Sequence, residues 1–269
     1  MYQIMKVLAV MGSPHRGASQ ALTERIENKL KEHGDVEFNY LHLKDADLKP
    51  CRGCFVCFLK GKEKCPLKDD KESIEKQIDE ADGVIFVSPV YSMHVSYLMK
   101  LFIDRFSYTF HRPRYFGKYA LALATTGNLG LKETLGYLKG VALCWGFEYV
   151  DQIGVASPPK PLLPLKAQRD RTDEVVKKFH QAMAEKRPRK LGLIDHLMFH
   201  SMRTVYGKFV NISPVPRDYT YWKERGMFEP GRKYYVEAVD SFFGNLIAKV
   251  LSWSMGRQVQ KAIVQAKAG

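Results

Sequence analysis

Apolar and polar positions follow two alternating patterns over the first 156 residues. Short apolar runs, such as KVLAV at 6–10 and GVIFVS at 83–88, end at turn residues and predict strands. Between such runs, apolar residues recur at a helical period. The predicted strands are 6–10, 36–43, 83–88, 119–125 and 148–154, and the predicted helices are 19–33, 71–80, 96–108 and 131–143. Continuous apolar strands that alternate with helices indicate an α/β fold with a parallel sheet covered on both faces.

A proline-rich break follows this region. Residues 156–169 (ASPPKPLLPLKAQR) contain four prolines, which disfavour regular structure. A helix over 172–186 would complete the cover of the sheet, and RPRK at 187–190 indicates a connector. We therefore expect one domain over 1–187 and a separate extension over 188–269.

The extension is aromatic and basic, and it is predicted to be mostly helical. Two helices are expected, over 192–210 and 235–260. The stretch 234–256 is apolar apart from a few polar residues, so its apolar face should pack on the first domain or on a partner subunit. An interfacial membrane helix is the less favoured alternative, and we do not expect contact with a membrane surface.

The positive charge is concentrated in the second part of the chain. Of the 42 basic and 29 acidic residues, residues 1–156 hold 21 and 19, which leaves 21 and 10 for residues 157–269. This excess is either a solvated face or an attraction for an anionic partner, such as a dinucleotide or an acidic electron carrier. No DNA-reading pattern is present, so nucleic acid is not expected as a partner.

Four of the five cysteines lie in one segment, CRGCFVCFLKGKEKC, followed by Pro66. No secretory signal pattern precedes them, so we expect a reducing cytoplasmic location and thiols rather than disulfides. The spacing C-x2-C-x2-C-x7-C-P is typical of cysteines that ligate an iron–sulfur cluster. A [4Fe–4S] cluster is therefore favoured over zinc, which prefers two separated C-x2-C pairs, and over thiols that bind nothing. The proposed ligands are Cys51, Cys54, Cys57 and Cys65.

Three loops leave strands at the edge where an open parallel sheet binds ligands. Residues 11–22 (MGSPHRGASQAL) combine small residues and hydroxyls with the start of a helix, which suits a phosphate. Residues 88–105 place Tyr91 at the strand edge, and residues 124–130 (ATTGNLG) add hydroxyls and glycines.

These loops, taken in order, resemble a known family. GSPHRGASQ resembles the phosphate loop of flavodoxin-like NAD(P)H-dependent FMN reductases, and SPVY with the following helix resembles their flavin-ring loop. The cysteine segment between them resembles that of the iron–sulfur flavoprotein branch. The resemblance covers about residues 5–155 and implies a doubly wound, five-stranded parallel sheet of order 2-1-3-4-5.

The resemblance also implies an FMN site. Its phosphate contacts would be Ser13, His15, Ser19, Gln20 and Ala21; its ring contacts would be Pro89, Val90, Tyr91, Ser92 and Met93; the third loop would add Thr125, Thr126 and Gly127. The sequence departs from the family pattern where His15 replaces an arginine, Ser19 an asparagine and Gln20 a threonine.

The implied function is electron transfer by an FMN-dependent oxidoreductase. Electrons would pass between NAD(P)H or ferredoxin, FMN and the cluster, and no residue is assigned as a general acid or base. Two alternatives remain open: an NAD(P)H-dependent FMN or quinone reductase without a cluster, and a flavodoxin-type carrier. Family relatives imply a homodimer or homotetramer, and the aromatic extension could cover the flavin.

Overall fold

The computed structural model describes residues 4–156, 165–186, 191–208, 215–238 and 242–268. The chain forms two compact units. The first consists of residues 1–52, 67–110 and 114–187. The second consists of residues 53–66, 111–113 and 188–269, so it includes most of the cysteine segment. The sequence did not predict that residues 53–66 and 111–113 group with the C-terminal region.

The first unit is built on a parallel sheet. Its strands are β1 (Met5–Met11), β2 (Val36–His42), β3 (Gly83–Tyr91), β5 (Tyr119–Thr126) and β6 (Glu148–Ala156). They lie in the order β2-β1-β3-β5-β6, and all four pairings are parallel. The predicted order is confirmed, because the additional β4 (His94–Val95) is a two-residue strand that pairs antiparallel with β3 off the main path.

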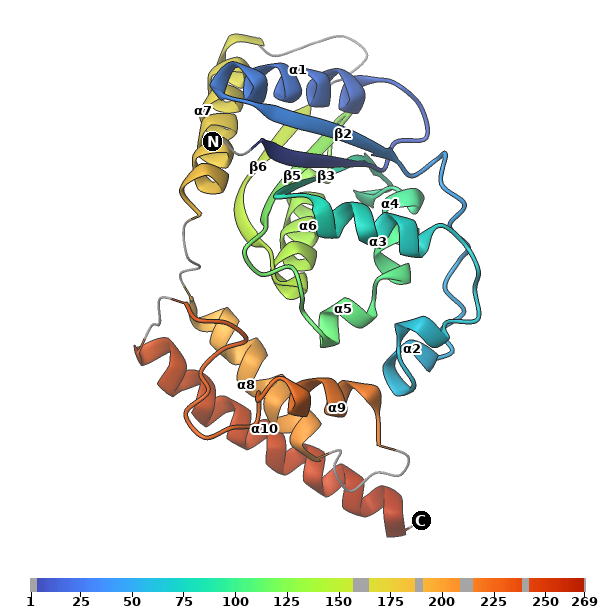
Figure 1. Ribbon diagram of the computed structural model, residues 1–269, viewed down its shortest axis with the longest axis vertical. Coiled ribbons are helices and arrows are strands. Elements are labelled where there is room, and N and C mark those ends of the chain that lie inside the picture. Colours follow the sequence, from blue (N-terminus) through green and yellow to red (C-terminus); the bar gives the residue numbers. More distant parts are fainter. Residues whose placement is uncertain (1–3, 157–164, 187–190, 209–214, 239–241, 269) are drawn as a thin grey trace. The chain divides into compact units, whose positions relative to one another are not determined.

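Helices cover both faces of this sheet (Figure 1). One face carries α1 (Ala18–His33) and α7 (Leu165–Glu185), and the other carries α3 (Lys71–Glu80), α4 (Tyr97–Arg105) and α6 (Leu131–Trp145). Because both faces are covered, the strands are apolar on both sides, as the continuous runs predicted.

The two faces have separate apolar cores. Alternate strand residues such as Val7 and Ile85 pack with Ile26 of α1 and Phe179 of α7. On the other face, Phe86 meets Trp145 of α6 edge-on at 6.0 Å between ring centroids. These side chains are almost fully buried. Each such side chain contributes about 1.5–3 kcal/mol of transfer free energy, which fixes the strands and the loops that leave them.

Several boundaries differ from the predictions. The helix predicted over 96–108 is two helices, α4 and α5 (Tyr108–His111). The helix predicted over 172–186 begins earlier, at Leu165. The prolines within 157–164 and the connector 187–190 lie outside the described residues.

The second unit is mostly helical, as predicted for the extension. It contains α2 (Val56–Leu59), the 3-10 turn η1 (Lys62–Lys64), α8 (Leu193–Gly207), α9 (Arg217–Glu224) and α10 (Phe242–Ala268). Fully buried Trp222 of α9 lies at its centre, 5.6 Å from the ring of Phe199 and 5.3 Å from that of Tyr206. The helix predicted over 235–260 corresponds to α10, which starts and ends later than predicted.

Hydropathy along the described helices does not indicate a bilayer span. None of them combines the length and the apolar composition that crossing a membrane requires.

Candidate functional site

A cavity of about 180 Å³ opens at the carboxyl edge of the parallel sheet. It is formed by three segments: the loop that enters α1, the end of β3, and the end of β5 with the residue after it. The residues that line it are Ser13, His15, Gly17, Ala18, Ser19, Pro89, Val90, Tyr91, Thr125, Thr126 and Gly127. The structure therefore brings all three predicted loops to one place.

The first loop runs very close to its neighbours. A Cβ atom on Gly12 would lie 3.0 Å from the carbonyl oxygen of Val87 and 3.0 Å from Cβ of Met99. The N–H of Gly12 donates to that Val87 carbonyl at 2.7 Å, and Ser96 Oγ donates to the Gly12 carbonyl at 2.5 Å. This packing fixes the loop on the sheet and directs the following residues into α1.

The amino terminus of α1 faces the cavity. Its N-cap residue is Gly17, no side chain caps it, and both Gly17 and Ala18 line the cavity. The first N–H groups of a helix have no partner within the helix, and they carry the positive end of its dipole. This end of α1 can therefore accept an anion.

Buried hydroxyls fix the floor of the cavity. Ser19 Oγ and Thr125 Oγ1 share a buried hydrogen bond of 2.7 Å that joins α1 to the end of β5. Ser13 Oγ donates to the carbonyl of His15 at 2.7 Å, and Thr126 Oγ1 donates to the carbonyl of Leu129 at 2.7 Å. These bonds shape each loop with polar groups that are already paired.

The second loop is a tight hairpin that the sequence did not predict. Tyr91 of β3 pairs with His94 of β4, and the two residues between them, Ser92 and Met93, have φ angles of 48° and 70°. Two successive positive φ angles are the geometry of a primed hairpin turn, which usually contains glycine or asparagine. A non-glycine residue in this region costs about 1–2 kcal/mol, so the strain is stored beside the cavity.

The third loop packs directly on this hairpin. Gly130 has a φ of +88°, and a Cβ there would lie 2.7 Å from Cγ1 of Val90 and 2.9 Å from Cα of Met93. Only glycine combines this backbone conformation with such close approach. Gly130 thus joins the second loop to the third.

Four residues predicted as flavin contacts do not line the cavity. The side-chain amide of Gln20 donates to the carboxylate of Glu24, one turn along the helix, at 2.8 Å, and Ala21 is exposed. Ser92 and Met93 form the hairpin turn instead. Two lining residues, Gly17 and Ala18, were not predicted. The available signal was their position, since a glycine directly before a helix and the first residue of that helix lie where its free N–H groups are.

The residues just before the cysteine segment are hydrogen-bonded to the residues just after it, within the first unit. The N–H of Asp47 donates to Asp70 at 2.8 Å, and the N–H of Lys49 donates to Asp69 at 3.0 Å. Arg105 donates to both carboxylate oxygens of Asp69 at 2.7 Å, in a pair whose side chains are 2% and 1% exposed. Burial alone would raise the pKa of Asp69, but the hydrogen bonds from Arg105 and from the backbone lower it, so the carboxylate is charged at neutral pH.

The four cysteine side chains differ in exposure. Cys51 and Cys54 are exposed, and Cys57 and Cys65 are half-buried. Among the residues that the structure describes, no three Cys, His, Asp or Glu side chains come together in a group that could hold a metal ion. The arrangement therefore does not bring the four predicted ligands together.

Unit two holds the tip of the cysteine segment through residues that the sequence did not single out. Arg112 donates to the carbonyl of Cys57 at 2.6 Å, and its Nε lies 3.2 Å from Oδ1 of Asp218. The other oxygen of Asp218 lies 2.7 Å from Nδ1 of His111, whose ring is 4.4 Å from that of Phe58. Asp218 of α9 thus orients the residues that fix Cys57.

The fold and the three-loop cavity define a flavodoxin-like protein with a place for a phosphate-bearing cofactor. The family model for NADPH-dependent FMN reductase matches residues 5–161, and the chain belongs to this family of flavin oxidoreductases. The predicted family is thereby confirmed.

Several curated relatives are named iron–sulfur flavoproteins. One from Archaeoglobus fulgidus is 29% identical over 228 residues, which covers 82% of this chain and 99% of the relative. Another, from Clostridioides difficile, is 28% identical over 227 residues and covers 83% and 100%. These alignments extend well past the flavodoxin-like region into the C-terminal unit.

Solved structures agree on the fold. An NADH:FMN oxidoreductase in its apo form aligns with a TM-score of 0.50 at 22% identity, over 66% of this chain and 89% of that one. An oxidoreductase from Corynebacterium diphtheriae aligns with a TM-score of 0.51 at 14% identity, over 68% and 99%.

Proposed function

We propose that the three-loop cavity binds FMN as the redox cofactor of this oxidoreductase. The observation that carries the proposal is the amino terminus of α1, which has no side-chain cap and lines a cavity at the carboxyl edge of the sheet. A phosphate at this position would receive hydrogen bonds from the first N–H groups of the helix. The family membership supports the same cofactor.

The phosphate contacts would come mainly from backbone and hydroxyl groups. Ser13 and Ser19 are buried in the cavity floor, and His15 is exposed at its edge. His15 lacks the charged fork of an arginine, so the helix terminus supplies much of the attraction. Gln20 and Ala21 would act only through their backbone N–H groups in the first turn.

The flavin ring would lie against the hairpin. Pro89, Val90 and Tyr91 line the cavity, and Ser92 and Met93 set the shape of the turn beside it. The backbone of Thr125, Thr126 and Gly127 would contact the ring from the other side. When bound, flavin accepts a hydride and releases electrons singly. The residues of the chain position the ring and limit water, and none is assigned a proton-transfer role.

We also propose Cys51, Cys54, Cys57 and Cys65 as ligands of a [4Fe–4S] cluster. The spacing of these cysteines and the names of the relatives support this. Among the described residues, these cysteines do not form a group that could hold a metal ion, so binding a cluster would require the segment to rearrange. Such a centre, once bound, carries one electron at a time.

The proposed donor is NAD(P)H or a reduced ferredoxin, and an acidic carrier would suit the basic C-terminal region. A homodimer or homotetramer is the proposed assembly, with residues 188–269 as the extension that shapes it. The second candidate is an NAD(P)H-dependent FMN or quinone reductase without a cluster, which the family membership supports equally.

Anaerobic purification tests both parts together. The proposal predicts a yellow protein that releases FMN, identified by mass, and that oxidises NAD(P)H in steady state. Iron and labile sulfide near four of each per chain would support the cluster. Bound FMN without iron would support the cluster-free reductase. A colourless protein that does not bind added FMN would contradict the flavin assignment.

A further inference from the structure

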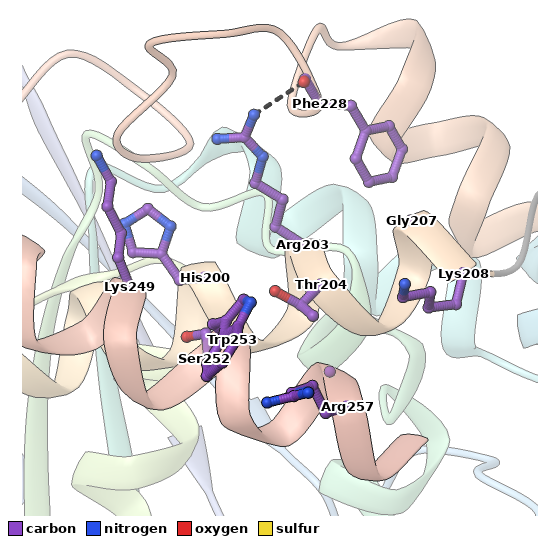
Figure 2. A pocket seen from close by; sticks show the side chains of 11 residues that line it. His200, Arg203, Thr204, Gly207, Lys208, Phe228, Lys249, Ser252, Trp253 and Arg257 are labelled. Atoms are coloured by element: carbon purple, nitrogen blue, oxygen red, sulfur yellow. Dashed lines mark hydrogen bonds between the residues drawn. The ribbon is translucent and has the colours of Figure 1, made fainter. Parts of the chain in front are cut away.

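A second and larger pocket lies wholly within unit two. Its volume is about 760 Å³, within the range that small-molecule sites occupy. Figure 2 shows that its walls come from α8 and α10, with Phe228 on the far side. The lining residues are His200, Arg203, Thr204, Gly207, Lys208, Phe228, Lys249, Ser252, Trp253, Gly256 and Arg257.

The charge of this pocket has one sign. Arg203, Lys208, Lys249 and Arg257 line it, and none of the described lining residues is a carboxylate. Glu229 interacts electrostatically with Arg203, but its own side chain is exposed and outside the lining. Four cations, with no acidic side chain in the described part of the wall, raise the local concentration of anions.

His200 does not add to this charge at neutral pH. Burial lowers its pKa, the hydrogen bond with Asn245 offsets part of this, and the nearby cations Lys249 and Arg203 lower the pKa further. Its ring nitrogen Nε2 lies 2.8 Å from Oδ1 of Asn245, which holds the ring in place. The positive charge of the pocket therefore comes from lysine and arginine side chains.

One of these cations is fixed by neutral groups. The guanidinium of Arg203 donates to the carbonyls of Phe228 and Glu229 at 2.8 Å each, and to the carbonyl of Arg232 at 3.0 Å. Figure 2 shows the first of these bonds at the wall of the pocket. Carbonyl groups orient the guanidinium but do not neutralise it, so its charge stays available to a ligand.

An aromatic side chain completes the lining. Trp253 is 63% exposed, whereas Trp145 and Trp222, the other tryptophans, are fully buried. Arg257 lies over the Trp253 ring, 4.7 Å from its centroid, so a cation and an aromatic face occur together. Ser252 and Thr204 add hydroxyl groups to the same wall.

We propose that this pocket binds a nucleotide, with the phosphates among the lysine and arginine side chains and the base against Trp253. Fixed cations recognise phosphate, and an aromatic face recognises a planar ring. A lipid headgroup would share the phosphate but not the ring, so the stacking face favours a nucleotide. The site is additional to the proposed flavin cavity and does not depend on it.

Tryptophan fluorescence of the FMN-loaded protein measures this binding directly. ADP is the probe, with excitation at the red edge of tryptophan absorption, where ADP is transparent. Saturable quenching with a Kd below about 1 mM is expected. Trp253→Phe should abolish the change; quenching that survives this substitution arises elsewhere and overturns the proposal.

Paired charge substitutions locate the phosphates. The double variant K249Q/R257Q should raise the Kd for ADP at least about tenfold. K223Q/R225Q, which removes two exposed charges from the α9 region outside the pocket, should change it less than about twofold. Equal losses in both variants would show non-specific attraction and overturn the site.

Two further probes separate the sources of phosphate. Inorganic phosphate should compete with ADP only weakly, because it lacks the ring. Vesicles with anionic lipid should not displace ADP. Binding to such vesicles without binding to ADP would show a headgroup site and overturn the nucleotide assignment, as would the absence of ADP binding at about 5 mM.

Discussion

Unit one, the α/β unit, and unit two, the helical unit, each form a cavity that suits an anion, but the two cavities are lined by different groups. In the α/β unit, the first turn of α1 and buried hydroxyls from Ser19 and Thr125 meet at a sheet edge, and the lining residues that the structure describes include no lysine or arginine. In the helical unit, four cationic side chains surround a larger pocket. Backbone donors are fixed by the fold, whereas long side chains other than the held Arg203 must be ordered on binding. We therefore expect the first cavity to be selective and the second to be sensitive to salt.

The largest expected effect is a loss of stability in unit two alone, caused by breaking the buried ion pair of Asp218 and Arg112. Their side chains are 4% and 8% exposed, so Asp218→Asn leaves a buried cation without its charge partner. We expect a loss of about 3 kcal/mol from the free energy of unfolding of unit two. Because Arg112 also fixes the carbonyl of Cys57, the Cys57 thiol should react faster with a thiol reagent.

Denaturant unfolding and thiol labelling check this variant, and FMN content should be unchanged. Glu224→Gln is the control, because Glu224 pairs with Arg217 on the same helix but is 61% exposed. If Asp218→Asn behaved like this control, the ion pair would not hold the cysteine segment.

Next in size is the effect of Gly130→Ala on the flavin cavity. The new Cβ would meet Val90 and the backbone of Met93, and the residue would be held at positive φ. We expect a loss of about 2–3 kcal/mol in stability and at least about a tenfold weaker affinity for FMN. Denaturant unfolding and flavin-fluorescence titration measure both.

The matched control is Gly136→Ala in α6. Nothing lies within 4 Å of a Cβ at Gly136, so this substitution should stabilise the helix by about 0.5–1 kcal/mol. Equal FMN affinity in both variants would mean that the hairpin does not border the flavin.

A smaller effect is expected from Ser19→Ala. This substitution removes the partner of Thr125 in the cavity floor, and the unsatisfied hydroxyl should cost about 1–2 kcal/mol of stability. Because Ser19 is also a proposed phosphate contact, FMN affinity should fall roughly tenfold. Gln20→Ala removes only a solvent-facing bond to Glu24 and should change the affinity less than about twofold. The reverse ranking, by the same titration, would favour the family pattern over the observed geometry.

The smallest effect compares salt dependence in the two cavities. Raising NaCl from about 50 mM to about 500 mM shortens the screening length from about 14 Å to about 4 Å. FMN affinity should fall less than about threefold, whereas ADP affinity should fall at least about tenfold. Parallel losses, measured by fluorescence titration of both ligands, would erase the distinction between the cavities.

The sequence predicted the sheet well because burial leaves a strong local signal. Strands such as 119–125 are apolar throughout, and parallel connections through helices limit the possible strand orders. The nine predicted residues that do line the cavity follow from the same geometry, since strand ends meet at one edge.

What the sequence did not predict depends on contacts between distant residues or on unusual backbone. The hairpin at Ser92 and Met93 lacks the glycine that normally marks such a turn. Arg112 and Asp218 are far apart in sequence, so no local pattern links them to Cys57. The ends of α10 were misplaced because much of its apolar surface, including Phe243 and Val250, is exposed rather than buried.

The most direct test of the central claim compares the affinities of FMN and riboflavin, which differ only in the phosphate. If the amino terminus of α1 holds that phosphate, FMN should bind at least about a hundredfold more tightly, a difference of about 2.7 kcal/mol. Flavin-fluorescence titration of the apoprotein measures both constants. Equal affinities would contradict the account, because the ring alone would then explain binding and the α1 terminus would have no ligand.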